Sequence, residues 1–222
     1  MTNGKPLALG AQPQICDTNP TMNAPAFSVL TICGLEELDD HSDNGVSHIL
    51  SILDPDWPEP GAFRTFDPHL RKTLYFHDAI EPAPSVVLPE KADVEAILAF
   101  GREVGGDLRH LLIHCHAGIS RSTAAMAIIL AQAFPHENES GIVDRLVRIR
   151  PQAWPNSRMI GFADELLGRD GRLSAAVRGI YARRLAARPE LAETMRGLNR
   201  AREVELGLST REVGSAWLIL GK

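Results

Sequence analysis

The chain has 222 residues, which is enough for one well-cored domain with an appendage and short for two full domains. Hydrophobic residues make up 44% of it, yet no apolar run approaches the roughly 20 residues that a membrane span needs. The net charge of −5 gives no basic field, which argues against a nucleic-acid binder that works by counterion release. We therefore expect one main domain, no membrane span and no nucleic-acid partner.

The N-terminal segment 1–24 is rich in Pro, Asn, Thr and Gly and lacks periodicity, which predicts a loosely ordered leader. It has no basic start followed by a sustained apolar stretch, so we expect no secretory signal and a cytoplasmic location. Three cysteines, Cys16, Cys33 and Cys115, cannot all pair with one another. We expect free thiols in a reducing compartment.

Strand patterns come early in the chain. Apolar runs predict strands over 26–34, 46–54 and 73–80, with a short helix or loop at 35–45 and a Pro-rich loop at 54–63. A helix is predicted over 89–104, because a proline stands at its start and acidic residues occupy its first turns. The uninterrupted apolar run in 109–115 indicates a central strand that is covered on both faces.

Helical patterns dominate the second half. Segment 122–134 is apolar almost all round, which indicates a buried helix, and amphipathic helices are predicted over 140–150 and 156–168. Beyond about residue 172, Ala, Arg, Glu and Leu predict two helices broken near Pro189, with their arginines facing solvent. We predict a three-layer α/β domain at 25–172, with a mostly parallel sheet flanked by helices, and a helical C-terminal extension at 173–222. The extension either packs on the core or offers a partner or oligomer surface.

The segment LLIHCHAGISRST, residues 111–123, joins the central strand to the buried helix. Backbone amides from His116 through Arg121 have no strand partner and no helical acceptor, so they can converge on one anion. Gly118 lets the chain bend tightly, and Arg121 offers a planar fork to two phosphate oxygens. The segment therefore predicts a phosphate cradle.

The same donors act on Cys115 at the start of this loop. Helix N-termini and neighbouring cations favour the thiolate form of a cysteine, which is a nucleophile. A thiolate and a bound phosphate repel each other unless the donors outweigh that repulsion. We therefore expect Cys115 to attack phosphorus only with the cradle and Arg121 in place.

HCHAGISRS, residues 114–122, resembles the His-Cys-x-x-Gly-x-x-Arg-Ser signature of the cysteine-dependent protein tyrosine phosphatases, and its Ala-Gly-x-Ser-Arg-Ser ending resembles the dual-specificity branch. The resemblance covers roughly residues 26–170. It implies the three-layer phosphatase fold and hydrolysis of a phosphomonoester in two steps through a cysteinyl-phosphate, with no metal and no cofactor. The implied roles are nucleophile (Cys115), phosphate clamp (Arg121), stabiliser of the departing thiolate (Ser122), backbone cradle (His116, Ala117, Gly118, Ile119, Ser120), and orientation of the cysteine or direct influence on its thiol (His114).

A general acid must protonate the leaving group. Asp78 follows a predicted strand a few tens of residues before Cys115, an order that resembles the dual-specificity pattern, and we prefer it. Three other carboxyl residues, Asp54, Asp56 and Glu59, stay open as candidates, because Asp56-Trp57-Pro58-Glu59 resembles the Trp-Pro-Asp acid loop of larger tyrosine-specific enzymes. Downstream, Asn156 is predicted to cap a helix N-terminus.

A metal site competes with the phosphate cradle, since His110, His114, Cys115 and His116 crowd together and His77 could approach. On a strand, however, His114 and His116 face one side and Cys115 the other, which disfavours zinc.

The residues of the loop also bear on the substrate. An inositol lipid is disfavoured because the variable loop positions carry no lysine, and an RNA 5′ end is disfavoured because Ser122-Thr123 departs from the Arg-Thr-Gly of capping-type enzymes. A catalytically silent protein that recognises phosphorylated partners also stays open. We expect a phosphorylated protein as the partner, with phosphotyrosine as the substrate and phosphoserine or phosphothreonine as possible additions.

Overall fold

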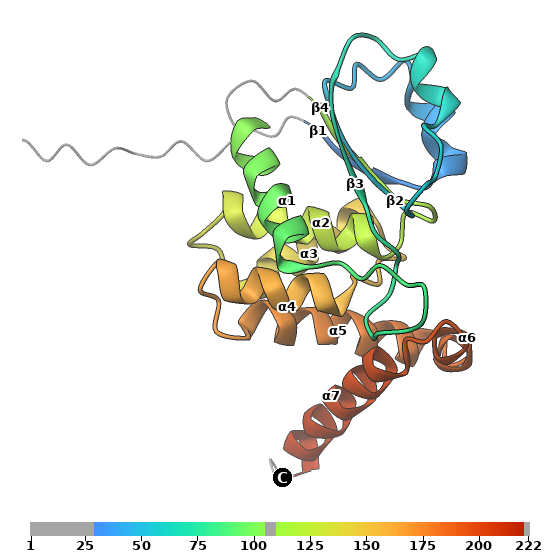
Figure 1. Cartoon of the computed structure of the whole chain (residues 1–222). Coiled ribbons are helices and arrows are strands. Elements are labelled where there is room, and N and C mark those ends of the chain that lie inside the picture. Colours follow the sequence, from blue (N-terminus) through green and yellow to red (C-terminus); the bar gives the residue numbers. More distant parts are fainter. Residues whose placement is uncertain (1–28, 105–109, 220–222) are drawn as a thin grey trace, which may run out of the picture.

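Four parallel strands form the sheet of this computed structural model, which describes residues 29–104 and 110–219 (Figure 1). The leader predicted for 1–24, the first residues of the first predicted strand and Cys16 lie outside the described residues. The strands are β1 (Val29–Cys33), β2 (His48–Leu53), β3 (Leu70–Tyr75) and β4 (His110–His114). Their order in the sheet is β1-β4-β2-β3.

Strand β4 lies inside the sheet between β1 and β2, and all of its residues are buried. Strands of a parallel sheet that is covered on both faces consist of continuous apolar residues, as Leu111, Leu112 and Ile113 do here. Ligands of such sheets bind beyond the carboxyl ends of the strands. The residue that follows β4 therefore stands at the middle of the binding edge.

The described residues form seven α-helices and two short 3₁₀ helices. The 3₁₀ helices lie on the face of the sheet opposite to α2 (Figure 1). The α-helices are α1 (Lys91–Val104), α2 (Arg121–Ala133), α3 (Glu139–Ile149), α4 (Ser157–Leu166), α5 (Arg172–Ala187), α6 (Leu191–Gly197) and α7 (Ala201–Ile219). The 3₁₀ helices are η1 (Leu35–His41) and η2 (Gly61–Arg64).

Alternating strand residues fill two apolar layers. Leu50, Ile52 and Ile113 pack with α2, whose residues 121–131 are all buried. Ile49 and Leu112 face the opposite side and pack under η1 and η2. Helices therefore flank both faces of a parallel sheet, and the predicted α/β fold is confirmed.

The third strand ends earlier than its predicted limit of residue 80. The amide of Phe76 still donates to the carbonyl of Leu53 (2.9 Å), but the next amide, that of His77, donates to Val87 (2.8 Å). The chain therefore leaves the sheet after Tyr75, and Asp78 lies in a loop.

The C-terminal region holds three helices where two were predicted. The break near Pro189 is present, and a second break separates α6 from α7, where Asn199 adopts the left-handed conformation with φ +58°. The prediction that the arginines of this segment face solvent is wrong for Arg200, which is only 3% exposed. The boundaries at 24 and 172 stay predictions.

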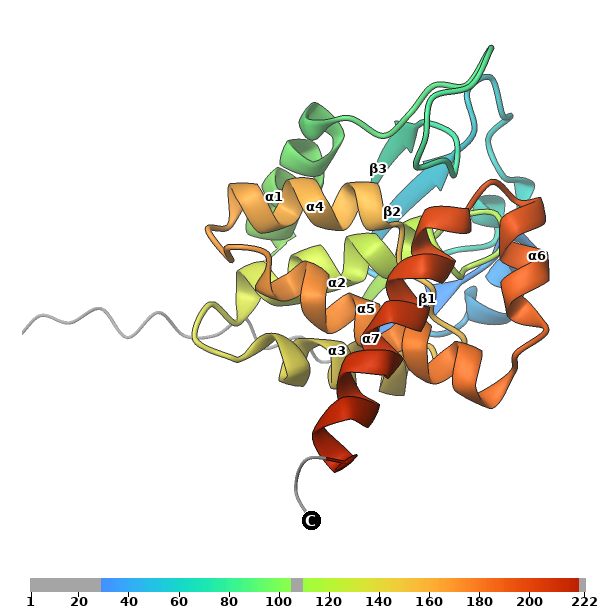
Figure 2. The ribbon, with the colours of Figure 1, turned by 90° about the horizontal axis from the view of Figure 1, so that it is seen from below.

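Helix α7 lies against α5, and buried side chains of both helices belong to the core that also contains the sheet (Figure 2). A Cβ atom added to Gly207 of α7 would lie 2.8 Å from the Cβ atom of Tyr181 and 2.9 Å from a methyl group of Leu185. The two helix backbones thus approach as closely as a glycine allows. None of the described helices is both long and apolar enough to cross a membrane.

This close approach predicts opposite effects for two glycine-to-alanine substitutions. Gly207→Ala is expected to lower the free energy of unfolding by about 1–3 kcal/mol, because it overpacks the contact. Gly161→Ala, in α4 with no atom near the added methyl group, is expected to raise it by about 1 kcal/mol, because alanine favours helix. Urea denaturation of both variants measures the two changes, and equal effects would contradict the packing described.

Candidate active site

Cys115 is the first residue after β4 and is 2% exposed. Its Sγ atom lies 3.2 Å from the hydroxyl oxygen of Ser122, which belongs to the first turn of α2. The end of the central strand and the start of the buried helix thus bring these two predicted residues into contact.

The loop between Cys115 and α2 is held by its carbonyl oxygens. The carbonyl of His116 accepts from the amide of Leu35 (2.9 Å), and that of Gly118 accepts from Nε of Arg150 (3.0 Å). The carbonyls of Ile119 and Ser120 accept from the amides of Trp154 (2.9 Å) and Asn156 (3.4 Å). In the described part of the chain, no amide of residues 116–120 donates to a protein acceptor. These amides are therefore available to an anion.

Gly118 has the left-handed φ of +67° that a side chain disfavours. A Cβ atom at this position would lie 2.5 Å from the carbonyl carbon of Cys33 and 2.6 Å from the amide nitrogen of Gly34. The glycine of the signature is therefore needed both for the turn and for the contact with the end of β1.

An ion pair that was not predicted from the sequence supports this loop from the side of η1. Arg150 bonds both carboxylate oxygens of Glu37 (3.0 and 2.8 Å), and Glu37 also accepts from the amide of Gly34 (2.6 Å). Burial raises the pKa of Glu37, but the bonds from Arg150 and Gly34 outweigh it and hold the pKa below its usual value. The ionised pair fixes Gly34 and Gly118 relative to each other.

Arg121 lies at the start of α2 and is 3% exposed. Its Nη1 atom donates to Oδ1 of Asp54 (2.6 Å) and to the carbonyl oxygen of Phe76 (2.6 Å). Its Nε atom is buried and has no partner among the described residues. One nitrogen thus fixes the guanidinium, while a buried N–H still lacks the acceptor that such groups normally find.

Asp78 reaches the same place from the loop after β3. Its Oδ1 atom accepts from Ser120 Oγ (2.8 Å), Asn156 Nδ2 (3.0 Å) and Arg200 Nη1 (2.8 Å), and its Oδ2 atom accepts from none of the described residues. Burial, the largest influence, raises the pKa of Asp78, but the charges of Arg200 and Arg121 outweigh it and lower the pKa. Asp78 is therefore an ionised carboxylate at neutral pH.

Asn156 caps α4, as predicted, because its Oδ1 atom accepts from the amides of Arg158 (3.1 Å) and Met159 (3.2 Å). Its Nδ2 atom is then free to donate to Asp78. The cap thereby connects α4 to the carboxylate.

A cavity of about 700 Å³, which we call the Cys115 hollow, opens over these groups. It is lined by the thiol side (Cys115, His116, Ala117, Arg121), by Asp54 and the loop at His77–Ala83 and Val86, and by the α6–α7 region (Arg196, Leu198, Asn199, Ala201, Arg202). Two of the other candidate acids, Asp56 and Glu59, do not line it. Asp56 is exposed, and Glu59 is bonded to Arg71 on the surface.

The four histidines considered for a metal site have separate partners. His110 bonds Thr31, His114 bonds Ser51, His116 accepts from the amide of Asp54, and His77 accepts from the amide of Val87. No three His, Cys, Asp or Glu side chains of the described residues are arranged to hold a metal ion.

His114 is fully buried, with its Nε2 atom 2.7 Å from the hydroxyl oxygen of Ser51. Burial is the main cause that lowers its pKa to about 4, so the ring is neutral at pH 7. A neutral ring brings no positive charge to the neighbouring thiol, which favours the orienting role over the electrostatic one.

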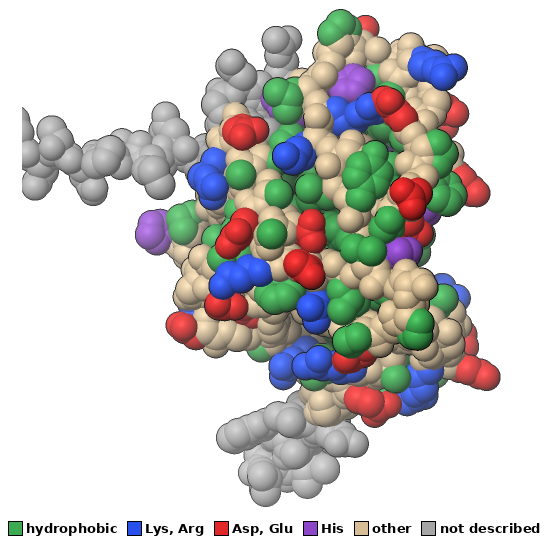
Figure 3. Space-filling model, viewed as in Figure 1, with side chains coloured by type: hydrophobic (Ala, Val, Ile, Leu, Met, Phe, Trp, Pro, Cys, Tyr) green, Lys and Arg blue, Asp and Glu red, His purple; other side chains and the backbone are tan. Residues whose placement is uncertain are grey.

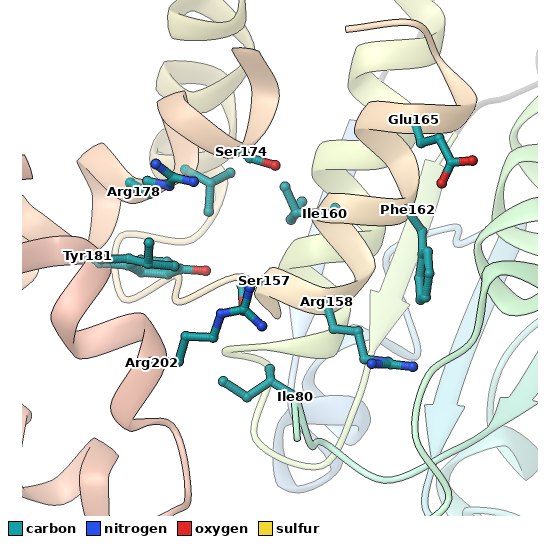
Figure 4. Close-up of a pocket in the computed structure, with 13 residues that line it drawn as sticks. Ile80, Ser157, Arg158, Ile160, Phe162, Glu165, Ser174, Arg178, Tyr181 and Arg202 are labelled. Carbon is teal, nitrogen blue, oxygen red and sulfur yellow. The ribbon is translucent and has the colours of Figure 1, made fainter. Parts of the chain in front are cut away.

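A second cavity, of about 380 Å³, lies between α4, α5 and α7 and shares Ile80 and Arg202 with the Cys115 hollow (Figure 4). The described residues that line it include Arg158, Arg178 and Ser174 but no cysteine or histidine. Cys115, His116, Ala117 and Arg121 therefore line the Cys115 hollow and not the second cavity.

No protein-family model matches the chain. In sequence, the chain is similar to the MAP kinase phosphatase with leucine-rich repeats protein 2 of Dictyostelium discoideum, with 33% identity over 126 residues. The match covers 56% of this chain and 15% of that protein, so the chain spans only a small part of the length of this relative. The resemblance to cysteine-dependent phosphatases that the signature indicates is thereby confirmed.

Solved phosphatase structures also match. Human DUSP28 has a TM-score of 0.47 at 17% identity, over 63% of this chain and 94% of that chain. Cydia pomonella PTP-2 phosphatase has a TM-score of 0.47 at 16% identity, over 62% and 84%. PTPMT1 in complex with PI(5)P has a TM-score of 0.44 at 12% identity, over 64% and 92%.

The neutral, buried His114 predicts acid sensitivity. The unfolded chain binds a proton here below about pH 6.5 and the folded chain only below about 4, so stability is lost as the pH falls between these values. The full loss corresponds to roughly 3 kcal/mol. Urea titrations between pH 7 and 4 are expected to show a flatter pH dependence for His114→Gln than for the wild type or for His136→Gln, which alters an exposed ring. An unchanged slope in His114→Gln contradicts the prediction.

Proposed function

We propose that this chain is a phosphomonoester hydrolase that resembles the dual-specificity phosphatases and acts on phosphotyrosine in proteins, with phosphoserine and phosphothreonine as further candidate substrates. The observation that carries the proposal is the meeting, in one hollow, of a buried thiol, unpartnered loop amides and an Arg121 N–H that lacks an acceptor. Such a constellation binds a phosphate next to a nucleophile.

In the first step of the proposed reaction, the amides of residues 116–120 and Nε of Arg121 hold the phosphate oxygens. The Cys115 thiolate attacks phosphorus in line, the sulfur–phosphorus bond forms and the bond to the leaving oxygen breaks. Oδ2 of Asp78, which faces no protein donor, gives its proton to that oxygen. Because the pKa of Asp78 is lowered, we expect this transfer to be most effective at acid pH.

In the second step, a water molecule attacks the cysteinyl-phosphate, and the Asp78 carboxylate accepts its proton. The sulfur–phosphorus bond breaks and inorganic phosphate leaves. The Ser122 hydroxyl, 3.2 Å from Sγ, donates a hydrogen bond to the departing thiolate. No metal ion is needed in either step.

A phosphoinositide is a second candidate substrate. The loop supplies no lysine, but Arg196 and Arg202 line the Cys115 hollow from α6 and α7. Both guanidiniums are paired, with Glu205 (2.7 Å) and Glu81 (3.4 Å), so an additional phosphate would have to displace these carboxylates. Acidic and basic side chains are also interspersed on the face in Figure 3. We therefore favour a protein substrate, and a higher kcat/KM for a phosphoinositide than for a phosphotyrosine peptide would reverse that choice.

A cytoplasmic setting is part of the proposal, since Cys33 and Cys115 are both free and buried and free thiols persist in reducing compartments. The partner or oligomer surface expected on the C-terminal helices stays a prediction.

Two cysteine variants test the proposal. The full chain is expected to hydrolyse para-nitrophenyl phosphate with or without a chelator. Cys115→Ser is expected to abolish both turnover and the formation of the cysteinyl-phosphate intermediate. Cys33→Ser is the matched control, because burial is the main cause that raises the pKa of Cys33 to about 12 and leaves it a protonated thiol. An active Cys115→Ser protein would falsify the proposed function.

Leaving groups of different basicity distinguish the general acid from the residue that holds Arg121. Asp78→Asn is expected to lower kcat by about 10²–10⁴-fold for phenyl phosphate and by much less for a substrate with an acidic phenol. Asp54→Asn is expected to slow all substrates alike, because it loosens Arg121. Asp56→Asn, outside the hollow, serves as the control for both. A leaving-group dependence in Asp54→Asn and none in Asp78→Asn would exchange the two roles.

A further inference from the structure

Arg200 comes from the C-terminal region that the family resemblance does not cover, yet it reaches the centre of the site. It directly precedes α7 and is 3% exposed. Its Nη1 atom lies 2.8 Å from Oδ1 of Asp78, and both terminal nitrogens lie 3.1 Å from the hydroxyl oxygen of Ser120. One guanidinium therefore contacts the proposed acid and the cradle together.

Glu203 holds this guanidinium in place. Its carboxylate accepts from Nε (2.9 Å) and Nη2 (2.8 Å) of Arg200, a two-point pairing that fixes the plane of the fork. The fully buried Glu203 also accepts from the indole nitrogen of Trp154 (2.6 Å) and the amide of Ser157 (2.8 Å). Through Glu203, Arg200 is thus anchored to the start of α4 and to Trp154, and the amide of Trp154 donates to the loop carbonyl of Ile119.

The contacts of Asp78 are divided unequally between its two oxygens. Oδ1 receives all three donors, from Arg200, Ser120 and Asn156, and none of the described residues donates to Oδ2. A carboxylic acid delivers its proton from the oxygen that is not held by donors. Arg200, together with Ser120 and Asn156, therefore holds Oδ1 and leaves Oδ2 as the oxygen that can donate the proton.

We propose that Arg200 is a positioning residue for the proposed general acid, which fixes Oδ1 of Asp78, leaves Oδ2 to carry the proton, and sets the pH range of turnover. The inference rests on the proposed function. Arg200 itself touches neither phosphate nor leaving group in this role; it acts through Asp78.

The charged and titratable groups around Asp78 come from four elements. Arg200 precedes α7, Arg121 starts α2, His116 lies in the loop between β4 and α2, and Tyr181 lies on α5. Behind Arg200 stands Glu203, which balances part of its charge. Among these groups only Arg200 and Arg121 are permanent cations, and Arg121 is engaged by Asp54, so removal of Arg200 is expected to ease protonation of Asp78.

The test is the pH dependence of kcat/KM for phenyl phosphate, a substrate that needs the acid. In Arg200→Gln, the part of the kcat/KM profile that falls with rising pH (the falling limb) is expected to move toward higher pH by about one unit or more. The reason is that the positive charge that favours the ionised form of Asp78 is gone. In Arg200→Lys the charge remains, and the limb is expected to stay with that of the wild type. Arg188→Gln, which removes an exposed arginine paired with Glu190, is the matched control.

Arg200→Gln is destabilising, because it leaves the buried Glu203 without its cation. A second variant therefore serves as a control for loss of folding. Arg200→Gln with Glu203→Gln removes both charges, and its limb is expected to move in the same direction. Should both proteins be unfolded by circular dichroism, an NMR titration of the Asp78 carboxyl in the wild type decides. A midpoint below the ordinary aspartate value supports the inference, and one at or above it overturns it.

The outcomes separate this inference from the proposed function. If the wild type does not hydrolyse aryl phosphates, the proposed function fails. If the wild type turns over and Asp78→Asn removes the falling limb, but folded Arg200→Gln keeps the limb of the wild type, only the role of Arg200 fails.

Discussion

The site depends on a difference between the carbonyl oxygens and the amides of the loop that follows β4. Its carbonyl oxygens are bound by the surrounding protein, through Leu35, Arg150, Trp154 and Asn156, and its amides of residues 116–120 are left without acceptors in the described part of the protein. A peptide loop has equal numbers of donors and acceptors, so satisfying only the acceptors gives the hollow a positive inner surface with no added side chain. The close contact between Gly118 and the end of β1 keeps this arrangement rigid.

Around this loop, formal charges are nearly balanced. Asp54 pairs with Arg121, and Asp78 pairs with Arg200. His116 adds no full positive charge at neutral pH, because burial lowers its pKa. The attraction for an anion therefore comes mainly from the amides and the free N–H of Arg121, and it grows when Asp78 takes up a proton. In the proposed reaction, the protonation that prepares Asp78 to donate its proton therefore also favours the binding of phosphate.

The sequence predicted the parts of the site that lie close together along the chain. Cys115, Ser122, Arg121 and the cradle are neighbours in a strand, loop and helix, so their geometry follows from local structure. Asp78 could be chosen only because its position after a strand resembles the dual-specificity pattern. Its loop begins earlier than predicted, because the amide of His77 donates to Val87 and not to the neighbouring strand. Arg200 and Glu203 were missed because their i,i+3 spacing is also that of a solvent-exposed helix pair, and only the tertiary contact with Asp78, 122 residues away, shows otherwise.

The anchoring of Arg200 changes how the chain can be divided into parts. The region that resembles known phosphatases carries the proposed nucleophile and the proposed phosphate cradle, yet the counter-charge of the proposed proton donor comes from beyond residue 172. Grafting the signature region alone onto another protein would transfer the proposed phosphate cradle, but the proposed acid would lose the charge of Arg200 and change in strength. Recombination between relatives would therefore preserve phosphate capture more readily than it preserves the pH at which the captured group is released.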